Sequence, residues 1–393
     1  MAVAYARQRP FSLPFFSTVK KCFHSAQSME QTLKAAIEGR NFLHIPRLLS
    51  SYPQKPHPNP FSFLSSSSPV TQIKTVDEIL QSLISLRPRP VSSTTYFLLL
   101  TQYLTNSNLL PLTLAILQQY IRSGSKIPQQ TRLSLSQSWL HQRCTQTIVD
   151  ILSETRSIGY PPDRSTCNYI ISSLCSVDEV GEAVSILREM RKARCEPDAE
   201  SYDLVIEAAC RKRRTKELVE ILGEMIRIGI RPKQGTVLRV VSALRANGDV
   251  WRAKEIVVGL ERHGVEVGFH SFEVLLEGCL KMNEFLLAAE VVMEMTDRGL
   301  IPYIDARQRV VEGLASVGEF RLQFEIAHLV EEQFIVNKTA YEAANWANNG
   351  GLVYHSKTVH GAANCSRDIC IILGLLRKLC NFTRQSKIKK KQT

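Results

Sequence analysis

The chain has 393 residues, of which 44% are hydrophobic and 22% are charged, so it can bury a sizeable core and has an ordinary charge content. Its formal net charge of +12 favours polyanionic partners, and nucleic acid is a better candidate than an anionic membrane surface. Basic terminal segments supply much of this excess of positive charge. The ten cysteines form no CxxC pair, which argues against a zinc site or a disulfide framework, and no apolar run approaches the ~20 residues of a membrane-spanning helix.

The first 29 residues have the composition of an organelle transit peptide. They contain Arg7, Arg9, Lys20 and Lys21 and no acidic residue, with hydroxyl and phenylalanine side chains interspersed. Positive charge on an amphipathic helix suits import driven by a membrane potential, which favours the mitochondrion; a chloroplast address and a disordered basic leader are the alternatives. Residues 30–92 follow as a linker and leading helical segment, because proline and serine are concentrated between about 50 and 74.

Between residues 93 and 333 the turn residues recur with a fixed period. The dipeptide Pro-Asp occurs twice, and other dipeptides stand at the equivalent positions of the later units. The five dipeptides are 35 residues apart: Pro162-Asp163, Pro197-Asp198, Pro232-Lys233, Val267-Gly268 and Pro302-Tyr303. Three positions before each pair stands a helix-ending residue: Gly159, Arg194, Gly229, Gly264 and Gly299. Glycine can take the left-handed conformation that ends a helix, and proline prevents its continuation, so each unit closes with the same stop signal.

Between these stops the apolar residues show helical spacing twice in each unit. In the first clear unit, one face comprises Cys167, Ile170, Ile171 and Leu174, and a second comprises Val180, Ala183, Val184, Leu187 and Met190. One helical hairpin cannot bury its apolar face alone, whereas stacked neighbours can. The pattern therefore predicts an all-α fold, an α-α superhelix solenoid of six to seven antiparallel helix pairs with a 35-residue period. Residues 334–393 are a divergent basic tail, which would add non-specific affinity for polyanions or act as a solubilising end.

A 35-residue helix pair that ends in Pro-Asp resembles the pentatricopeptide repeat family. The segment from Thr166 to Cys175, continuing to Pro197-Asp198, carries the resemblance, and the segment from Gly223 to Pro232 matches almost as well. The tetratricopeptide family, with a period of about 34 residues and other consensus residues, ranks second. The resemblance covers roughly 60% of the chain by the span of the repeats and implies a plant-type protein of the P subfamily, without a catalytic C-terminal extension.

In this family the fifth and the last residue of a unit together contact one RNA base, and the second residue sandwiches that base. The resemblance therefore implies four candidate pairs: Asn168 with Asp198, Asp203 with Lys233, Leu238 with Gly268, and Glu273 with Tyr303. The first pair resembles a uracil-preferring combination, and the later pairs depart from the familiar ones. The second residues also depart from the usual Val or Ile: Ser165, Glu200, Gly235 and His270.

Arg211 and Lys281 fall where the family often places a phosphate contact, which favours sequence-tolerant binding. The basic run from Arg211 to Arg214 is a further candidate for phosphate, with a solvated turn as the alternative. For the first pair the alternative is that Asp198 caps a helix while Asn168 lies on a solvated face. No P-loop, dinucleotide glycine motif, Gly-x-Ser-x-Gly or deaminase signature is present, so we expect no enzyme, cofactor, metal site or small-molecule substrate.

These features predict an organellar adaptor that binds single-stranded RNA in transcript processing or stability, through a basic concave surface and a few side-chain contacts to bases. The alternative is a structural scaffold, such as an organellar ribosome-associated protein, that uses the concave face for protein partners. The face formed by the first helices discriminates between them, because a positive face supports RNA and an apolar face supports a protein.

Overall fold

The computed structural model describes residues 29–50, 59–86, 92–104 and 109–328, and their regular secondary structure is entirely helical. The chain divides into two compact units, Met1–Val291 and Val292–Thr393, which are described separately. The predicted transit peptide, apart from residue 29, and the predicted tail at 334–393 lie outside the described residues. Within the described ranges, none of the helices combines the length and apolar character that crossing a lipid bilayer requires.

A leading group of helices precedes the repeats. Residues 29–38 are helical and are followed by η1 (Phe42–His44), α2 (Ile45–Leu49), η2 (Ser62–Ser66) and α3 (Pro69–Ile84). The Ser68 side chain accepts a hydrogen bond from the Thr71 N–H, and Pro69 stands at the first helical position, where its missing N–H is not needed. Phe61 is completely buried. The linker predicted at about 50–74 is therefore wrong for residues 59–74, where proline and serine begin a packed helix.

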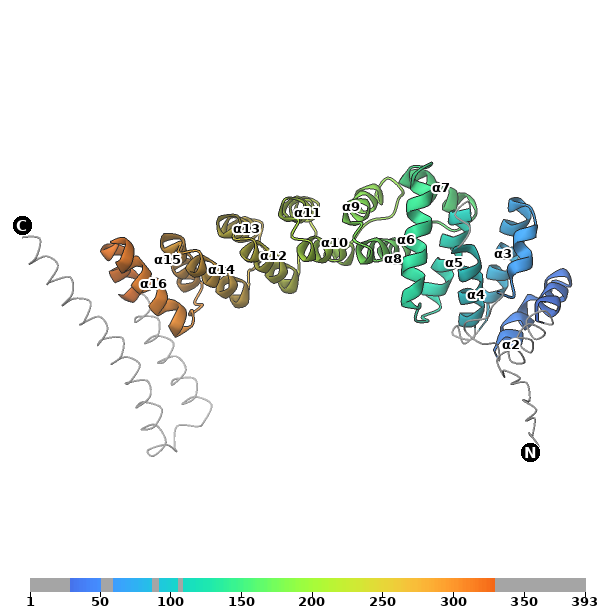
Figure 1. Ribbon diagram of the computed structural model, residues 1–393, viewed down its shortest axis with the longest axis horizontal. Coiled ribbons are helices and arrows are strands. Elements are labelled where there is room, and N and C mark those ends of the chain that lie inside the picture. Colours follow the sequence, from blue (N-terminus) through green and yellow to red (C-terminus); the bar gives the residue numbers. More distant parts are fainter. Residues whose placement is uncertain (1–28, 51–58, 87–91, 105–108, 329–393) are drawn as a thin grey trace, which may run out of the picture. The chain divides into compact units, whose positions relative to one another are not determined.

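From residue 93 the helices form antiparallel pairs: α4 (Ser93–Leu104) with α5 (Leu110–Arg122), α6 (Gln129–Arg143) with α7 (Ile148–Ser157), α8 (Arg164–Ser176) with α9 (Val180–Glu189), α10 (Ala199–Arg211) with α11 (Thr215–Arg227), and α12 (Gln234–Ala246) with α13 (Val250–Arg262). They are followed by α14 (Phe269–Lys281) and by α15 (Phe285–Asp297), in which the boundary between the two compact units lies. Figure 1 shows α8, α10, α12 and α14 in one row and α9, α11 and α13 in a second row. From α4 to α14 each first helix packs on the next first helix, and α4, α8, α10 and α12 also pack on their own partners, which confirms the predicted solenoid of helix pairs.

The period of the helices matches the period of the turn residues. The first helices α6, α8, α10, α12 and α14 begin at Gln129, Arg164, Ala199, Gln234 and Phe269, so each step is 35 residues. We name the units by their residues: 129–163, 164–198, 199–233, 234–268 and 269–303. In the second compact unit, α16 (Ile304–Val317) begins one further step along the chain.

The predicted stop residues have the left-handed backbone that ends a helix. Their φ angles are 93° at Gly159, 55° at Arg194, 82° at Gly229, 70° at Gly264 and 69° at Gly299. A second left-handed position, which sequence analysis did not identify, recurs in the turn between the two helices of a unit: Asp178, Arg213, Gly248 and Asn283. In the four units from residue 164 to residue 303, both turns thus depend on a conformation that glycine adopts at the least cost.

Replacing Arg194 with Gly is expected to raise the free energy of unfolding by about 0.5–1 kcal/mol, because a residue with a Cβ is strained at this φ. Urea denaturation followed by circular dichroism measures the change. Gly229→Ala is the matched control at the equivalent stop and should destabilise by a similar amount. A destabilised Arg194→Gly variant would mean that the arginine side chain contributes more than its backbone strain costs.

The two apolar faces of each unit are buried as predicted. Val205, Ile206, Ile221 and Leu244 have no exposed surface, and Ile256 is only partly buried. The cysteines of these faces are free thiols, and burial raises the pKa of Cys175 to about 11 and that of Cys279 to about 12. These thiols are therefore protonated at neutral pH and behave as small core residues.

Trp139 joins unit 129–163 to unit 164–198. Its ring is completely buried, and its indole Nε1 donates to Glu182 Oε1 at 3.0 Å. The same carboxylate oxygen accepts from Arg143 Nε at 2.6 Å. Because Trp139 and Arg143 lie on α6 and Glu182 lies on α9, this cluster fixes one helix pair against the next.

Candidate functional site

The fifth and the last residue of unit 164–198 meet where the next unit begins. Asp198 is the N-cap of α10, and its carboxylate accepts from the Ser201 N–H at 3.0 Å. The Ser201 hydroxyl in turn donates to Asn168 Oδ1 at 2.7 Å. Asn168 is only 7% exposed, so it does not lie on a solvated face, whereas the helix-capping role of Asp198 is confirmed. The two side chains are thus held side by side through one serine.

The electrostatics of this cluster keep Asp198 ionised at neutral pH. Burial by itself raises the pKa of Asp198, but hydrogen bonds from the Ser201 N–H and hydroxyl and the positive charge of Arg164 outweigh burial, so the pKa lies below its ordinary value. Arg164 Nη1 lies 3.4 Å from Asp198 Oδ2. The cluster therefore presents an acceptor at Asp198 and a donor at the Asn168 amide.

Unit 199–233 has the same arrangement with different chemistry. Lys233 Nζ lies 3.4 Å from Asp203 Oδ2, and the Thr236 hydroxyl donates to Asp203 Oδ1. The Asp203 side chain is 14% exposed and the Lys233 side chain 66% exposed. This unit therefore presents an ammonium donor and covers its carboxylate.

Unit 234–268 offers no side-chain hydrogen bond at the equivalent positions, which are Leu238 and Gly268. The Gln234 side chain covers the glycine: its Oε1 accepts from Gly268 N at 2.9 Å, and its Nε2 donates to Glu266 O. A Cβ at position 268 would lie 2.8 Å from Gln234 Oε1, so a larger residue there would have to displace this side chain. In the last candidate pair, Glu273 is buried; Tyr303 belongs to the second compact unit and is exposed.

The third residue of each unit contributes to the site, and sequence analysis did not single it out. It is a hydroxyl residue in five successive units, and each is at most 4% exposed: Thr131, Thr166, Ser201, Thr236 and Ser271. Ser201 and Thr236 hold the fifth residue of the preceding unit, as described above. A serine or threonine that recurs at the 35-residue step is the sequence signal that could have identified these positions.

The second residues of the units, Ser165, Glu200, Gly235 and His270, are all exposed on the first-helix side of the solenoid. The His270 ring lies 5.8 Å from the ring of the adjacent Phe269 in an edge-to-face arrangement. The side chains at these positions are therefore accessible, but apart from His270 they offer no aromatic or aliphatic surface on which a base could stack.

The two candidate phosphate contacts have different surroundings. Arg211 Nη1 lies 3.4 Å from Glu207 Oε1, so a neighbouring acid partly neutralises its charge. The Lys281 side chain is exposed and makes no hydrogen bond or ion pair with any residue in the described part of the chain. Within the basic run, Lys212 Nζ lies 2.7 Å from Asp178 Oδ2 and Arg214 Nη1 3.3 Å from Glu217 Oε1. Lys281 is thus the better placed of the two for an anion.

The face formed by the first helices is charge-balanced, and the predicted basic concave surface is wrong for this part of the chain. Helices α8, α10, α12 and α14 carry five basic side chains (Arg164, Arg211, Arg239, Arg245, Lys281) and five acidic ones (Glu200, Asp203, Glu207, Glu273, Glu277). Several pair across neighbouring units, as Arg239 does with Glu207 at 2.9 Å and Arg245 with Glu277. The basic excess of the sequence lies mainly in residues 1–28 and 329–393.

The chain is similar to known families and proteins of helical repeats. Residues 162–211 match the model of the PPR repeat family, and residues 200–230 match the PPR repeat model. A pentatricopeptide repeat-containing protein from Arabidopsis thaliana is 50% identical over 334 residues, which are 84% of this chain and 96% of that protein. The similarity therefore covers nearly the whole of the relative.

Among solved structures, a pentatricopeptide repeat protein from maize is 16% identical with a TM-score of 0.35, and the match covers 74% of this chain and 48%, about half, of that one. The PPR domain of protein-only RNase P 1 from Arabidopsis thaliana, solved in complex with tRNA, is 14% identical with a TM-score of 0.34 over 47% of this chain.

Proposed function

This chain belongs to the pentatricopeptide repeat family, and from that premise we propose that it is an RNA-binding adaptor that holds a single-stranded organellar transcript during its processing or stabilisation. The observation that carries the proposal is the cluster of Asn168, Asp198 and Ser201, in which a donor and an acceptor are held side by side at a unit boundary. The array proposed for residues 93–333 would present this boundary to RNA. We propose no catalytic role.

The proposed selectivity follows from the chemistry of each pair. The Asn168 amide donates and the Asp198 carboxylate accepts, which matches a base edge with a carbonyl oxygen beside an N–H, as in uracil. Lys233 offers an ammonium group that suits a base carbonyl or a phosphate oxygen. Leu238 and Gly268 offer no side-chain hydrogen bond. Binding would therefore be selective at one or two bases and tolerant at the others.

Affinity from phosphate contacts would depend on Lys281 more than on Arg211. We expect Lys281→Ala to weaken RNA binding and to reduce the slope of log K against log salt by about 0.7–1, because one released counterion is lost. Arg211→Ala should have a smaller effect, since Glu207 shares the charge of Arg211. Fluorescence anisotropy across a potassium chloride series measures both slopes.

Lys216→Ala removes the same charge from second helix α11 and serves as the control. If the Lys281→Ala slope matches that of the wild type, Lys281 makes no phosphate contact. If the Lys216→Ala slope falls equally, the effect is general electrostatics and is not specific to the first-helix face.

A second candidate function is a structural scaffold for protein partners. The observation behind it is that the charges of the first-helix face pair across units, as Arg239 does with Glu207, so this face lacks the positive excess that would favour RNA over protein. Crosslinking in the organelle followed by sequencing of the co-purified RNA separates the two. We expect enrichment of one or a few transcripts with crosslinks at uridines. RNA no more enriched than with the affinity tag alone would reject the RNA adaptor. The acid-free composition of residues 1–29 supports the mitochondrion as the compartment for this experiment, with the chloroplast as the alternative.

A further inference from the structure

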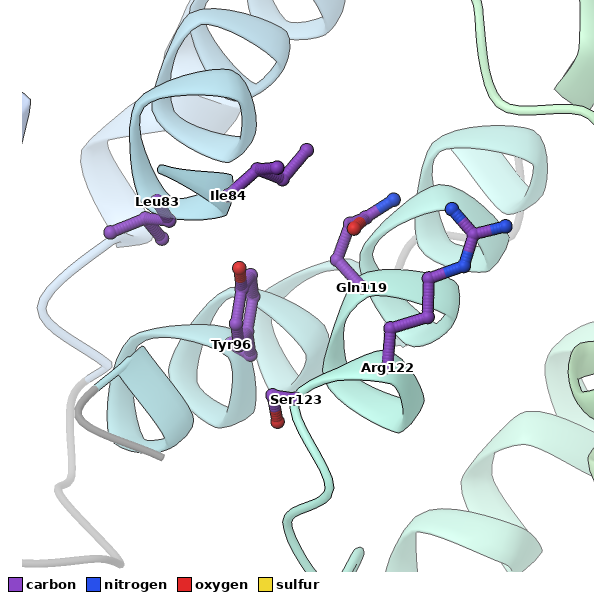
Figure 2. Close-up of a pocket in the computed structure, with 6 residues that line it drawn as sticks. All are labelled: Leu83, Ile84, Tyr96, Gln119, Arg122 and Ser123. Carbon is purple, nitrogen blue, oxygen red and sulfur yellow. The ribbon is translucent and has the colours of Figure 1, made fainter. Parts of the chain in front are cut away.

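A pocket of about 170 Å³ opens between the ends of α3, α4 and α5, on the N-terminal side of unit 129–163 (Figure 2). Its lining residues are Leu83, Ile84, Tyr96, Gln119, Arg122 and Ser123. The Tyr96 ring is backed by Tyr120, with ring centroids 6.3 Å apart and planes inclined by 29°. The walls thus combine aliphatic and aromatic surface with a few polar groups, a composition typical of binding sites for small molecules.

Gln119 is the unusual member of this pocket. The residue as a whole is only 6% exposed, and its carboxamide hydrogen-bonds none of the residues that the structure describes. Its oxygen and nitrogen are not among the fully buried side-chain atoms that lack a partner, so they reach the opening of the pocket. Figure 2 shows the carboxamide pointing away from α5 toward the space that Ile84 borders. Because the carboxamide faces the pocket and has no protein partner, its donor and acceptor groups are available to a ligand that enters the pocket.

The pocket is connected directly to the row of candidate base contacts. Arg122 Nη2 lies 2.9 Å and Arg122 Nε 3.0 Å from Asp163 Oδ2. Asp163 is the last residue of unit 129–163, the position equivalent to Asp198 and Lys233. Gln118 Nε2 also donates to Pro161 O at 2.7 Å and so ties α5 to the same loop. A nucleotide beside Asp163 would therefore lie next to the pocket.

We propose that this pocket takes one unpaired nucleobase of the bound RNA, adjacent to the base at unit 129–163; this inference rests on the proposed function. Tyr96 and the aliphatic pair Leu83 and Ile84 flank the planar ring. The Gln119 carboxamide, with one acceptor and two donors, hydrogen-bonds the edge of the base. The volume admits one planar ring with its substituents and is smaller than the roughly 300 Å³ at which sites for drug-sized ligands begin.

Gln119→Leu tests the proposal, because leucine keeps much of the volume and removes the hydrogen-bonding groups. The melting temperature should stay about the same, since the carboxamide hydrogen-bonds none of the residues that the structure describes. Affinity for an RNA selected by the wild-type protein from a random-sequence pool should fall about 5- to 10-fold. One abasic position in that RNA should weaken wild-type binding by at least the same factor and should weaken Gln119→Leu binding much less, which identifies the contacted base.

Two further variants make the result decisive. Gln142→Leu removes another largely buried carboxamide, which is hydrogen-bonded to Gln146 and lies outside the pocket, and it should leave RNA affinity unchanged. Ile84→Trp, at a partly exposed wall, should obstruct the pocket and reproduce the abasic result. If Gln119→Leu and Ile84→Trp both bind the selected RNA as the wild type does, the pocket holds no base and the proposed function stands. If the wild type selects no RNA, both proposals are overturned.

Discussion

Replacing Trp139 with Ala is expected to lower the free energy of unfolding by about 3–5 kcal/mol, the range for truncating a buried aromatic residue. Trp139 has no exposed surface, and no smaller side chain at this position can fill its place between helix pairs. The variant also removes the hydrogen bond from Nε1 to Glu182 at 3.0 Å. Because each unit of a solenoid is held only by its neighbours, the loss affects units 129–163 and 164–198 together.

Trp139→Phe is the matched control, since it keeps most of the buried ring and removes only the indole N–H and part of the volume. It should cost less than the alanine variant, about 1–2 kcal/mol, because Arg143 still donates to the Glu182 carboxylate at 2.6 Å. Urea unfolding followed by far-ultraviolet circular dichroism measures both. A loss below about 1 kcal/mol for Trp139→Ala would show that α6 and α9 are held together mainly by other contacts.

Replacing Asn168 with Ala is expected to abolish base discrimination at one position of the bound RNA, a loss of about 5- to 100-fold, which corresponds to the 1–3 kcal/mol of one well-oriented amide-to-base contact. The amide is oriented because Ser201 donates to its Oδ1 at 2.7 Å, so its N–H groups are directed elsewhere. The fold should tolerate the change, since the Ser201 hydroxyl still has Asp198 Oδ1 as an acceptor at 3.0 Å. Selection of RNA from a random pool by wild type and variant measures the preference.

Leu238 occupies the equivalent position in unit 234–268 and cannot donate or accept, so Leu238→Ala is the control and should leave every preference unchanged. Ser201→Ala keeps the amide but removes the group that orients it, and should weaken the discrimination only in part. No change in Asn168→Ala would remove Asn168 from the set of base contacts. Altered preferences at several positions would mean that the substitution disturbs the stacking of units.

The predictions from sequence agree best with the structure where the backbone conformation of a single residue decides where a helix ends. Gly159 and Gly229 end helices with φ angles of 93° and 82°, and Arg194 does so at 55°, as the repeat of stop residues predicts. Helical spacing likewise predicts which apolar residues are buried, because a single helix face decides it. Both properties depend on neighbours within a few positions along the chain, so they can be read without knowledge of the packing.

The site itself was only partly predictable. The resemblance indicated Asn168 and Asp198, but not that Ser201, 33 residues after Asn168, joins them. The charge of the first-helix face was predicted wrongly, because net charge says nothing about where the charges lie: the basic excess is in the terminal segments, and Glu207 and Glu277 balance the arginines of neighbouring units. Composition also predicted a linker where Phe61 is buried.

By itself, then, the sequence determined the kind of helices, their 35-residue period and the faces that they bury, since these follow from torsional preferences and from spacing along one helix. Only the tertiary structure decided which polar groups meet between units: the serine that orients Asn168, the acids that neutralise the first-helix face, and the unpartnered Gln119 in its pocket. Such contacts join residues more than thirty positions apart, and their geometry depends on how successive helix pairs stack.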